Sequence, residues 1–165
     1  MSKKHFILTA VEALPNYRLR LTYADGQTFE VDLSDWINTT KALAALKDAN
    51  LFAKATVGFG GHSVDWIEGE LDLGADNLRN LAIEQAGGIG HERIWNWLHE
   101  TGLTLEQAAE ALGISRRMLI YYRDGEKPIQ RSIWLACLGW AAVRPQGRSL
   151  PKRIPSAREY AATHD

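Results

Sequence analysis

Cysteine and long apolar runs are scarce in this 165-residue chain. Cys137 is the only cysteine, and because one thiol cannot form an internal disulfide, it fits a reducing compartment. No apolar run approaches the roughly 20 residues of a membrane-spanning helix, and residues 1–4 are not followed by the apolar region of a signal peptide. With 45% hydrophobic and 24% charged residues, the sequence predicts a soluble, cytoplasmic protein without a membrane partner.

The sequence also lacks a convincing catalytic motif. Residues 58–61 are rich in glycine, but no Lys-Ser or Lys-Thr pair follows them, so they predict a hairpin loop and not a phosphate-binding loop. His91 and His99 are eight residues apart, so they lack the four-residue spacing of the two histidines on a zinc-protease helix. One acidic group could hold a cation or a basic partner, although a solvated loop has the same composition: Asp65, Glu68, Glu70 and Asp72. We expect no enzyme activity, cofactor or metal.

A net charge of −1 excludes a strongly basic nucleic-acid coat protein, but the charge is unevenly distributed. Residues 1–89 carry 8 Lys and Arg against 12 Asp and Glu, a net charge of −4. Residues 90–165 carry 11 against 8, a net charge of +3. This modest asymmetry favours contact with DNA through the C-terminal half.

Residues 104–123 have the pattern of two short helices joined by a tight turn. Thr104 followed by Gln107 is a capping box, Gly113 can adopt the positive φ of a helix end, and Ser115 can cap the next helix. One apolar face on the first helix is formed by Leu105, Ala108, Ala109 and Leu112. This helix-turn-helix layout presents its second helix to a DNA major groove.

The second helix has an inward face and an outward face. Leu119 and Tyr122 are spaced to pack against the first helix, whereas Arg116 and Arg117 point outward at its beginning. Arginine can bond a guanine through two parallel hydrogen bonds, and apolar tips can contact thymine methyl groups. The remaining outward residues are Ile120, Tyr121 and Arg123. Two helices of an ordinary bundle with solvated arginines are the alternative.

Several positions together give residues 91–143 a resemblance to a lambda-repressor-like (Cro/cI-type) DNA-binding domain: residues 102–104, Ala109, Gly113, Ile114, Ser115, Leu119, Asp124 and Gly125. The resemblance implies that four side chains face the bases, namely Arg116, Arg117, Ile120 and Tyr121, and that Arg123 and Lys127 lie near the DNA backbone. The sequence departs from the family at Leu105, where many members have a phosphate-contacting Gln, and at Arg123, where an acidic residue is frequent. The missing Gln and the acidic balance of the whole chain keep a protein–protein adaptor open as the alternative.

The N-terminal half has the alternation of β-strands. Residues 17–23 and 28–33 predict an antiparallel pair around a type I′ turn at Asp25-Gly26. Residues 6–8 together with Val11 predict a preceding strand that ends at a turn at Pro15-Asn16, and residues 55–59 and 63–66 predict a second pair. Asp76 is expected to cap a closing helix. This half resembles a small uncharacterised bacterial α+β domain, on the strength of residues 21–26, 31–33, 51–52, 64–66 and 71–73. That family is of unknown function and is sometimes encoded near toxin–antitoxin-like genes.

The fold prediction is therefore an α+β N-terminal domain at residues 1–88, with a small antiparallel sheet plus helices. A flexible glycine-rich joint at residues 86–90, for which a tight turn inside one domain is the alternative, leads to an all-α lambda-repressor-like helix-turn-helix domain at residues 89–145. A disordered basic tail at residues 146–165 follows. An apolar helix through Ile133 to Val143 should be buried on most sides, and its two tryptophans leave a homodimer interface open. The functional prediction is a transcriptional regulator of double-stranded DNA, with the N-terminal domain available to a protein partner. The antitoxin-like member of a gene pair is one form of it.

Overall fold

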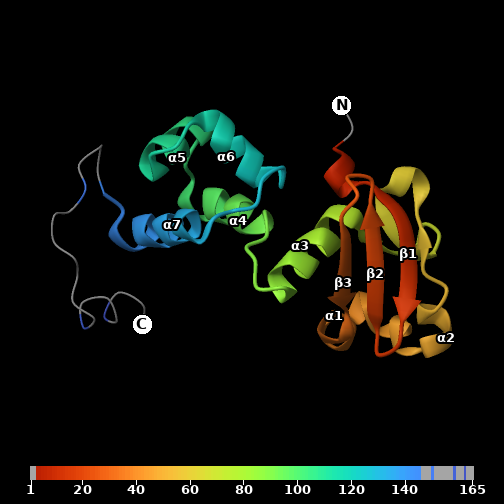
Figure 1. The fold of residues 1–165 in the computed structure, drawn as a ribbon. Coiled ribbons are helices and arrows are strands. Elements are labelled where there is room, and N and C mark those ends of the chain that lie inside the picture. The colour runs from red at the N-terminus through yellow and green to blue at the C-terminus, as the bar shows by residue number, and fades with distance from the viewer. Residues whose placement is uncertain (1–2, 146–149, 151–157, 159–161, 163–165) are drawn as a thin grey trace. The chain divides into compact units, whose positions relative to one another are not determined.

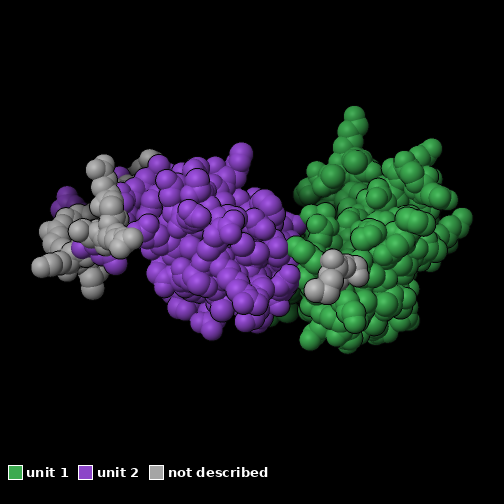
Figure 2. Space-filling model, turned by 90° about the horizontal axis from the view of Figure 1, so that it is seen from above, with its two compact units in different colours: residues 1–90 green, residues 91–165 purple. Residues whose placement is uncertain are grey.

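The computed structural model describes residues 3–145 together with residues 150, 158 and 162. The chain forms two compact units, Met1–Gly90 and His91–Asp165, which Figure 2 shows in separate colours. Among the residues described, no helix combines the length and the apolar character that crossing a membrane requires. The tail predicted at residues 146–165 lies outside the described residues except at the three isolated positions.

The N-terminal unit is built on a three-stranded antiparallel meander (Figure 1) of β1 (Leu8–Leu14), β2 (Arg18–Tyr23) and β3 (Thr28–Asp32). The pairing of residues 18–23 with residues 28–32 confirms the predicted hairpin. Successive side chains of a strand point to opposite faces, so the strict alternation in β2 buries every second residue. The residues of β2 and β3 that this places in the core, each at most 1% exposed, are Leu19, Leu21, Tyr23 and Val31.

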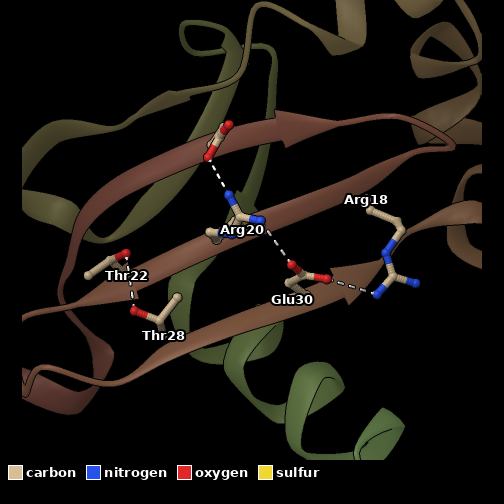
Figure 3. A network of polar contacts seen from close by, with 6 residues as sticks. Arg18, Arg20, Thr22, Thr28 and Glu30 are labelled. Atoms are coloured by element: carbon tan, nitrogen blue, oxygen red, sulfur yellow. Dashed lines mark hydrogen bonds and ion pairs between the residues drawn. The ribbon is translucent and has the colours of Figure 1, made fainter.

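The other face of this sheet carries an exposed polar network (Figure 3). Arg20 of β2 donates to Glu12 of β1 at 2.8 Å and to Glu30 of β3 at 3.1 Å, and Glu30 also accepts from Arg18 at 3.3 Å. The Arg and Glu side chains in this network are at least 42% exposed. These cross-strand ion pairs cover the solvent side of the sheet with polar groups.

The predicted type I′ turn at Asp25-Gly26 is wrong. A type I′ turn needs positive φ at both central residues, and here only Gly26 has one, at 86°. The Asp25 carboxylate instead accepts a hydrogen bond from the Gln27 N–H at 3.0 Å, which is an Asx turn. Two consecutive positive φ angles occur in the β1–β2 turn, at Asn16 (63°) and Tyr17 (59°).

Short elements complete the sheet's surroundings. The helical ones are η1 (Lys4–Phe6), α1 (Ser34–Thr39), η2 (Lys41–Lys47), α2 (Ala49–Phe52) and η3 (Phe59–Gly61). A second antiparallel sheet has the order β4 (Thr56–Val57), β5 (Ser63–Ile67) and β6 (Leu71–Gly74). Strand β1 contains the predicted Leu8 and Val11, but it begins two residues later than predicted because residues 4–6 form η1. Strand β6 was not predicted.

Helix α3 (Ala75–Gln85) runs along β3. Its N-cap is Gly74 and not Asp76, which lies inside the first turn, where its charge complements the helix dipole. At the other end, the Gln85 amide donates to the Asp32 carbonyl and its oxygen accepts from the Asp32 N–H, both at 2.8 Å. Gln85 thereby satisfies backbone groups that the sheet edge would otherwise expose.

Arg79 of α3 is the one buried arginine of the described chain, at 8% exposure. Its guanidinium donates to the His5 carbonyl and to the Asp25 carboxylate, both at 2.8 Å, and lies 4.9 Å from the ring centres of Tyr23 and Phe29. Burial alone would raise the pKa of the Asp25 carboxyl, but hydrogen bonds from Arg79 and from a backbone N–H outweigh it and lower that pKa. Arg79 therefore joins three segments that are far apart in sequence.

The glycines that were predicted to form a flexible joint are bonded to α3. Gly87 donates to the Glu84 carbonyl at 3.0 Å, and Gly88 to the Ile83 carbonyl at 2.9 Å, as in a helix C-cap. Gly90 donates to the Glu84 side chain at 2.9 Å and is buried. These residues end α3 within the N-terminal unit.

The described part of the C-terminal unit contains α4 (Glu92–Thr101), α5 (Leu105–Leu112), α6 (Arg116–Arg123) and α7 (Arg131–Val143) (Figure 1). Trp97 of α4 donates to the Cys137 carbonyl of α7 at 2.9 Å, and its ring meets Trp140 edge to face. The expectation that α7 is buried on most sides is wrong for this unit taken by itself. Cys137 alone is fully buried in α7, because the short helices beside it cover one side only, and the large exposed side chains are Leu135, Leu138 and Val143.

Candidate nucleic-acid interface

Helices α5 and α6 each begin at a side-chain cap, and a glycine ends α5 at the turn between them. The Thr104 hydroxyl accepts from the Gln107 N–H at 3.2 Å, and the Gln107 side chain accepts from the Thr104 N–H at 3.0 Å, which confirms the predicted capping box. Gly113 ends α5 with φ at 70°, a conformation that costs little only without a Cβ. Ser115 begins α6 by accepting from the Met118 N–H at 3.1 Å. The sequence therefore sets the relative direction of the two helices within three residues.

Helix α6 is anchored through one face. Leu119 is fully buried and Tyr122 is 6% exposed, while Ala108 and Ala109 of α5 are nearly fully buried as well. Small alanine side chains allow two helices to approach closely. Packing of this buried face therefore fixes the orientation of the opposite, outward face of α6.

The structure brings three of the six predicted DNA-contacting residues together. The Arg117 Nε–H donates to the Tyr121 hydroxyl at 2.6 Å, and its guanidinium carbon is 5.4 Å from the Tyr121 ring centre. The Lys127 ammonium, beyond the end of α6, is 4.9 Å from the centre of the same ring. Arg117 and Lys127 are exposed and Tyr121 is half-buried. The three side chains form a cluster of two cations around one aromatic ring, which we call the Tyr121 cluster.

Arg116 and Ile120 lie on the same helix outside this cluster. Arg116 is exposed and, within the described part of the chain, forms no hydrogen bond or ion pair. Ile120 is half-buried. The beginning of α6 thus presents one unrestrained arginine beside one restrained by Tyr121.

Arg123, the sixth predicted residue, is held against α4. Its Nε–H donates to the Asp124 carboxylate at 2.9 Å, and its guanidinium lies 5.0 Å from the ring centre of Trp95. Only 22% of the Arg123 side chain is exposed. Trp95 itself is 51% exposed. Trp95 directly follows Ile94 and so lies off the apolar face that Ile94 and Trp97 define, and this position in the sequence could have predicted its exposure.

Other concave or charged regions are less organised. A groove of about 680 Å³ lies beside α5 and α7, and it is lined by Leu103, Gln107, Glu110 and Trp140 among others, but by none of the six predicted residues. Within the described residues, no group of three or more His, Cys, Asp or Glu side chains is placed to hold a metal ion. Of the predicted acidic group, Asp65 accepts a hydrogen bond from the Ser63 hydroxyl at 2.5 Å.

Comparison with known proteins reveals one relative of nearly full length. It is a "Putative DNA Binding Protein" from Nitrosomonas europaea with a known crystal structure, 47% identical in sequence and similar with a TM-score of 0.83. The match covers 94% of this chain and 100% of that one. The two proteins belong to one family. Because so much of the chain is covered, the relationship includes helices of the C-terminal unit as well as the N-terminal unit.

The N-terminal unit contains a family domain. Residues 8–84 match the model described as "Protein of unknown function (DUF2442)", a range that runs from β1 to the last turn of α3. The likeness predicted for this half, to an uncharacterised α+β domain, agrees with that match. No curated protein matches the chain.

Proposed function

We propose that the C-terminal unit is a lambda-repressor-like helix-turn-helix domain and that the protein is a sequence-specific transcriptional regulator that binds double-stranded DNA. The observation that carries this proposal is the construction of α6. Its inner face is fixed by Leu119 and Tyr122, and its outer face begins with Arg116 and Arg117 in solvent. A helix fixed in this way can lie in a major groove with its first residues at the base edges. The Nitrosomonas europaea relative, which is named a "Putative DNA Binding Protein", supports the same function.

The six residues divide into two proposed roles. Arg116 and Arg117 read base edges, with Ile120 and Tyr121 beside them in the groove. Lys127 contacts the phosphate backbone, which positions α6 and supplies the part of the affinity that depends on salt. Arg123 lies near that backbone with its charge paired to Asp124 and 22% of its side chain exposed. The N-terminal unit provides contact with a protein partner or a second copy of the chain, and the protein acts in the cytoplasm. In a gene pair, such a regulator would be the antitoxin-like member.

The test uses the full-length chain and fragments of genomic DNA that include its own upstream region, with binding measured across salt concentrations. We expect one region to be retained, with an affinity that falls steeply as salt rises, because each neutralised phosphate adds about 0.9 to the slope. The variant Arg116→Ala/Arg117→Ala should lose this specific binding. The matched control Arg18→Ala/Arg20→Ala removes the same charge from the sheet of the N-terminal unit and should bind as the wild type does. An unchanged affinity of the α6 variant would contradict the proposal.

A protein–protein adaptor is the second candidate, and specific features of the C-terminal unit favour it. Trp95, Leu135 and Leu138 expose apolar surface, at 51%, 54% and 43%, and exposed apolar surface of this kind often marks a contact with another protein. An adaptor would retain no DNA even at low salt. It would capture its partner with an affinity indifferent to salt and to nuclease treatment.

A further inference from the structure

The Arg117 side chain is restrained before any ligand is present. Arg117 and Tyr121 are four residues apart on α6, so their side chains lie on the same face one turn from each other. The hydrogen bond from the Arg117 Nε–H to the Tyr121 hydroxyl is 2.6 Å long, and the guanidinium carbon is 5.4 Å from the ring centre. A long, flexible side chain therefore has a defined direction along the outer face of α6.

The ring that restrains Arg117 has a second cation beside it. The Lys127 ammonium is 4.9 Å from the Tyr121 ring centre, within cation–π distance. Within the described part of the chain, neither Lys127 nor Arg117 forms an ion pair with a carboxylate. The two positive groups therefore stay available to an anionic or electron-rich ligand. The contact with Lys127 also limits the movement of the ring whose hydroxyl bonds Arg117.

The donor that Tyr121 occupies decides what the guanidinium can still bind. Arginine has five N–H donors in a rigid fork, one on Nε and four on the two Nη atoms. Because the Nε–H is directed at Tyr121, a ligand cannot bind side-on to the Nε–H and one Nη–H together. The two Nη groups at the end of the side chain remain available as a pair of donors. Two parallel donors match the O6 and N7 acceptors of guanine in the major groove, which no other base presents as a pair.

We propose that Tyr121 is a positioning residue for Arg117, and that it directs the two Nη groups end-on to the guanine of one G·C pair in the DNA site. This inference rests on the proposed function. Restraint in the free protein raises affinity and selectivity because less side-chain freedom is lost on binding. Arg116 has no such restraint and serves as a control within the same helix.

The experiment selects preferred sites from a randomised double-stranded DNA library with full-length wild-type protein. Affinities for every single-base-pair change of the selected site are then measured for four variants: Arg116→Ala, Arg117→Ala, Tyr121→Phe and Arg117→Lys. The position whose base preference disappears in Arg117→Ala is the one that Arg117 reads, and Arg116→Ala identifies the neighbouring position in the same way. Tyr121→Phe removes only the hydroxyl and keeps the ring beside Lys127. Circular dichroism melting verifies that this variant is folded.

We expect guanine at the Arg117 position, with a wild-type preference of about 10-fold or more over the other bases. In Tyr121→Phe the ratio of affinities for guanine and for the other bases at the Arg117 position should fall by about 10-fold, so that a 10-fold preference nearly disappears. The base preference at the Arg116 position and the salt dependence of the affinity should stay unchanged. Arg117→Lys should weaken the preference, because lysine keeps the charge but loses the planar fork of two parallel donors. These results separate positioning from a general loss of binding.

Two outcomes overturn the inference while leaving the proposed function intact. One is a Tyr121→Phe protein that keeps the full preference at the Arg117 position, and the other is a base other than guanine at that position. A wild-type protein without any sequence preference would overturn the proposed function, and the inference with it.

Discussion

Arg79→Ala should destabilise the N-terminal unit strongly. The substitution removes two charge-assisted hydrogen bonds, to the His5 carbonyl and the Asp25 carboxylate, and leaves that carboxylate in a site where 24% of its side chain is exposed. Hydrogen bonds to charged groups contribute about 1.5–3 kcal/mol each. Breaking a mostly buried ion pair by removing one partner costs about 3–5 kcal/mol. We expect the free energy of unfolding of this unit to fall by about 3–5 kcal/mol, the range that both estimates support.

Arg20→Ala is a matched control, since Arg20 is the same residue type and also makes two short contacts with acidic or carbonyl oxygens. Its ion pairs with Glu12 and Glu30, at 2.8 and 3.1 Å, are as short as those of Arg79. The Arg20 side chain, however, is 44% exposed, against 10% for Arg79. Exposed ion pairs add little to stability, because water solvates both charges after separation. The Arg20 variant should therefore be nearly as stable as the wild type.

Hydrogen exchange measured by mass spectrometry on the full-length chain is the suitable assay, because peptides from the two units are read separately. Amides of β2, which lie at the centre of the first sheet, should exchange much faster in Arg79→Ala and almost unchanged in Arg20→Ala. Peptides from α4 to α7 serve as an internal reference. If amide exchange in β2 were accelerated equally in both variants, burial would not determine how much these contacts contribute to stability, and the argument would be refuted.

Other predictions concern pH, reactivity and capping. The pKa of Asp25 is lower in the folded unit than in the unfolded chain. Asp25 therefore stabilises the folded unit fully above the unfolded pKa, about 3.9, and this stabilisation is lost as pH falls through the folded pKa. Asp25→Asn should flatten this acid dependence of the free energy of unfolding, measured by denaturant titrations. Burial raises the pKa of the Cys137 thiol to about 12, so a thiol reagent at pH 8 should label Cys137 only in unfolding conditions, and rapid labelling of native protein would contradict this. Thr104→Ala, which removes the hydroxyl that caps α5, should lower the stability of the C-terminal unit by about 1 kcal/mol in a thermal melt, whereas Thr9→Ala should leave that unit unchanged.

The α5–α6 region was predictable because its determinants are local. Thr104 and Gln107 satisfy each other's backbone groups three residues apart, and Ser115 and Gly113 act on adjacent turns, so residue type and spacing define the structure. The β2–β3 pairing was predictable for a related reason, since period-two alternation in neighbouring segments specifies both face and register.

The errors of prediction come from interactions between distant residues or from competing local ones. The conformation of Asp25 depends on its own side chain and on Arg79, which is 54 residues away. Strand β6 has four residues, ends in glycine and exists through its pairing with β5, so its sequence alone carries little signal. The exposure of Leu135 likewise depends on how much of α7 the other helices cover, and the periodicity of the sequence does not predict that coverage.

The candidate interface was predicted as a set of six residues, but the structure gathers only Arg117, Tyr121 and Lys127 in one cluster. Asp124 and Trp95 instead hold the charge of Arg123 against α4. The cations of α6 that face solvent are therefore at its beginning, Arg116 and Arg117. The net charge of +3 on residues 90–165 is a poor measure of what α6 can bind, because recognition depends on where two or three cations are held and not on their total number. For the same reason, the net charge of −1 of the whole chain does not argue against the proposed function, because the charge of the N-terminal unit does not change which side chains α6 presents.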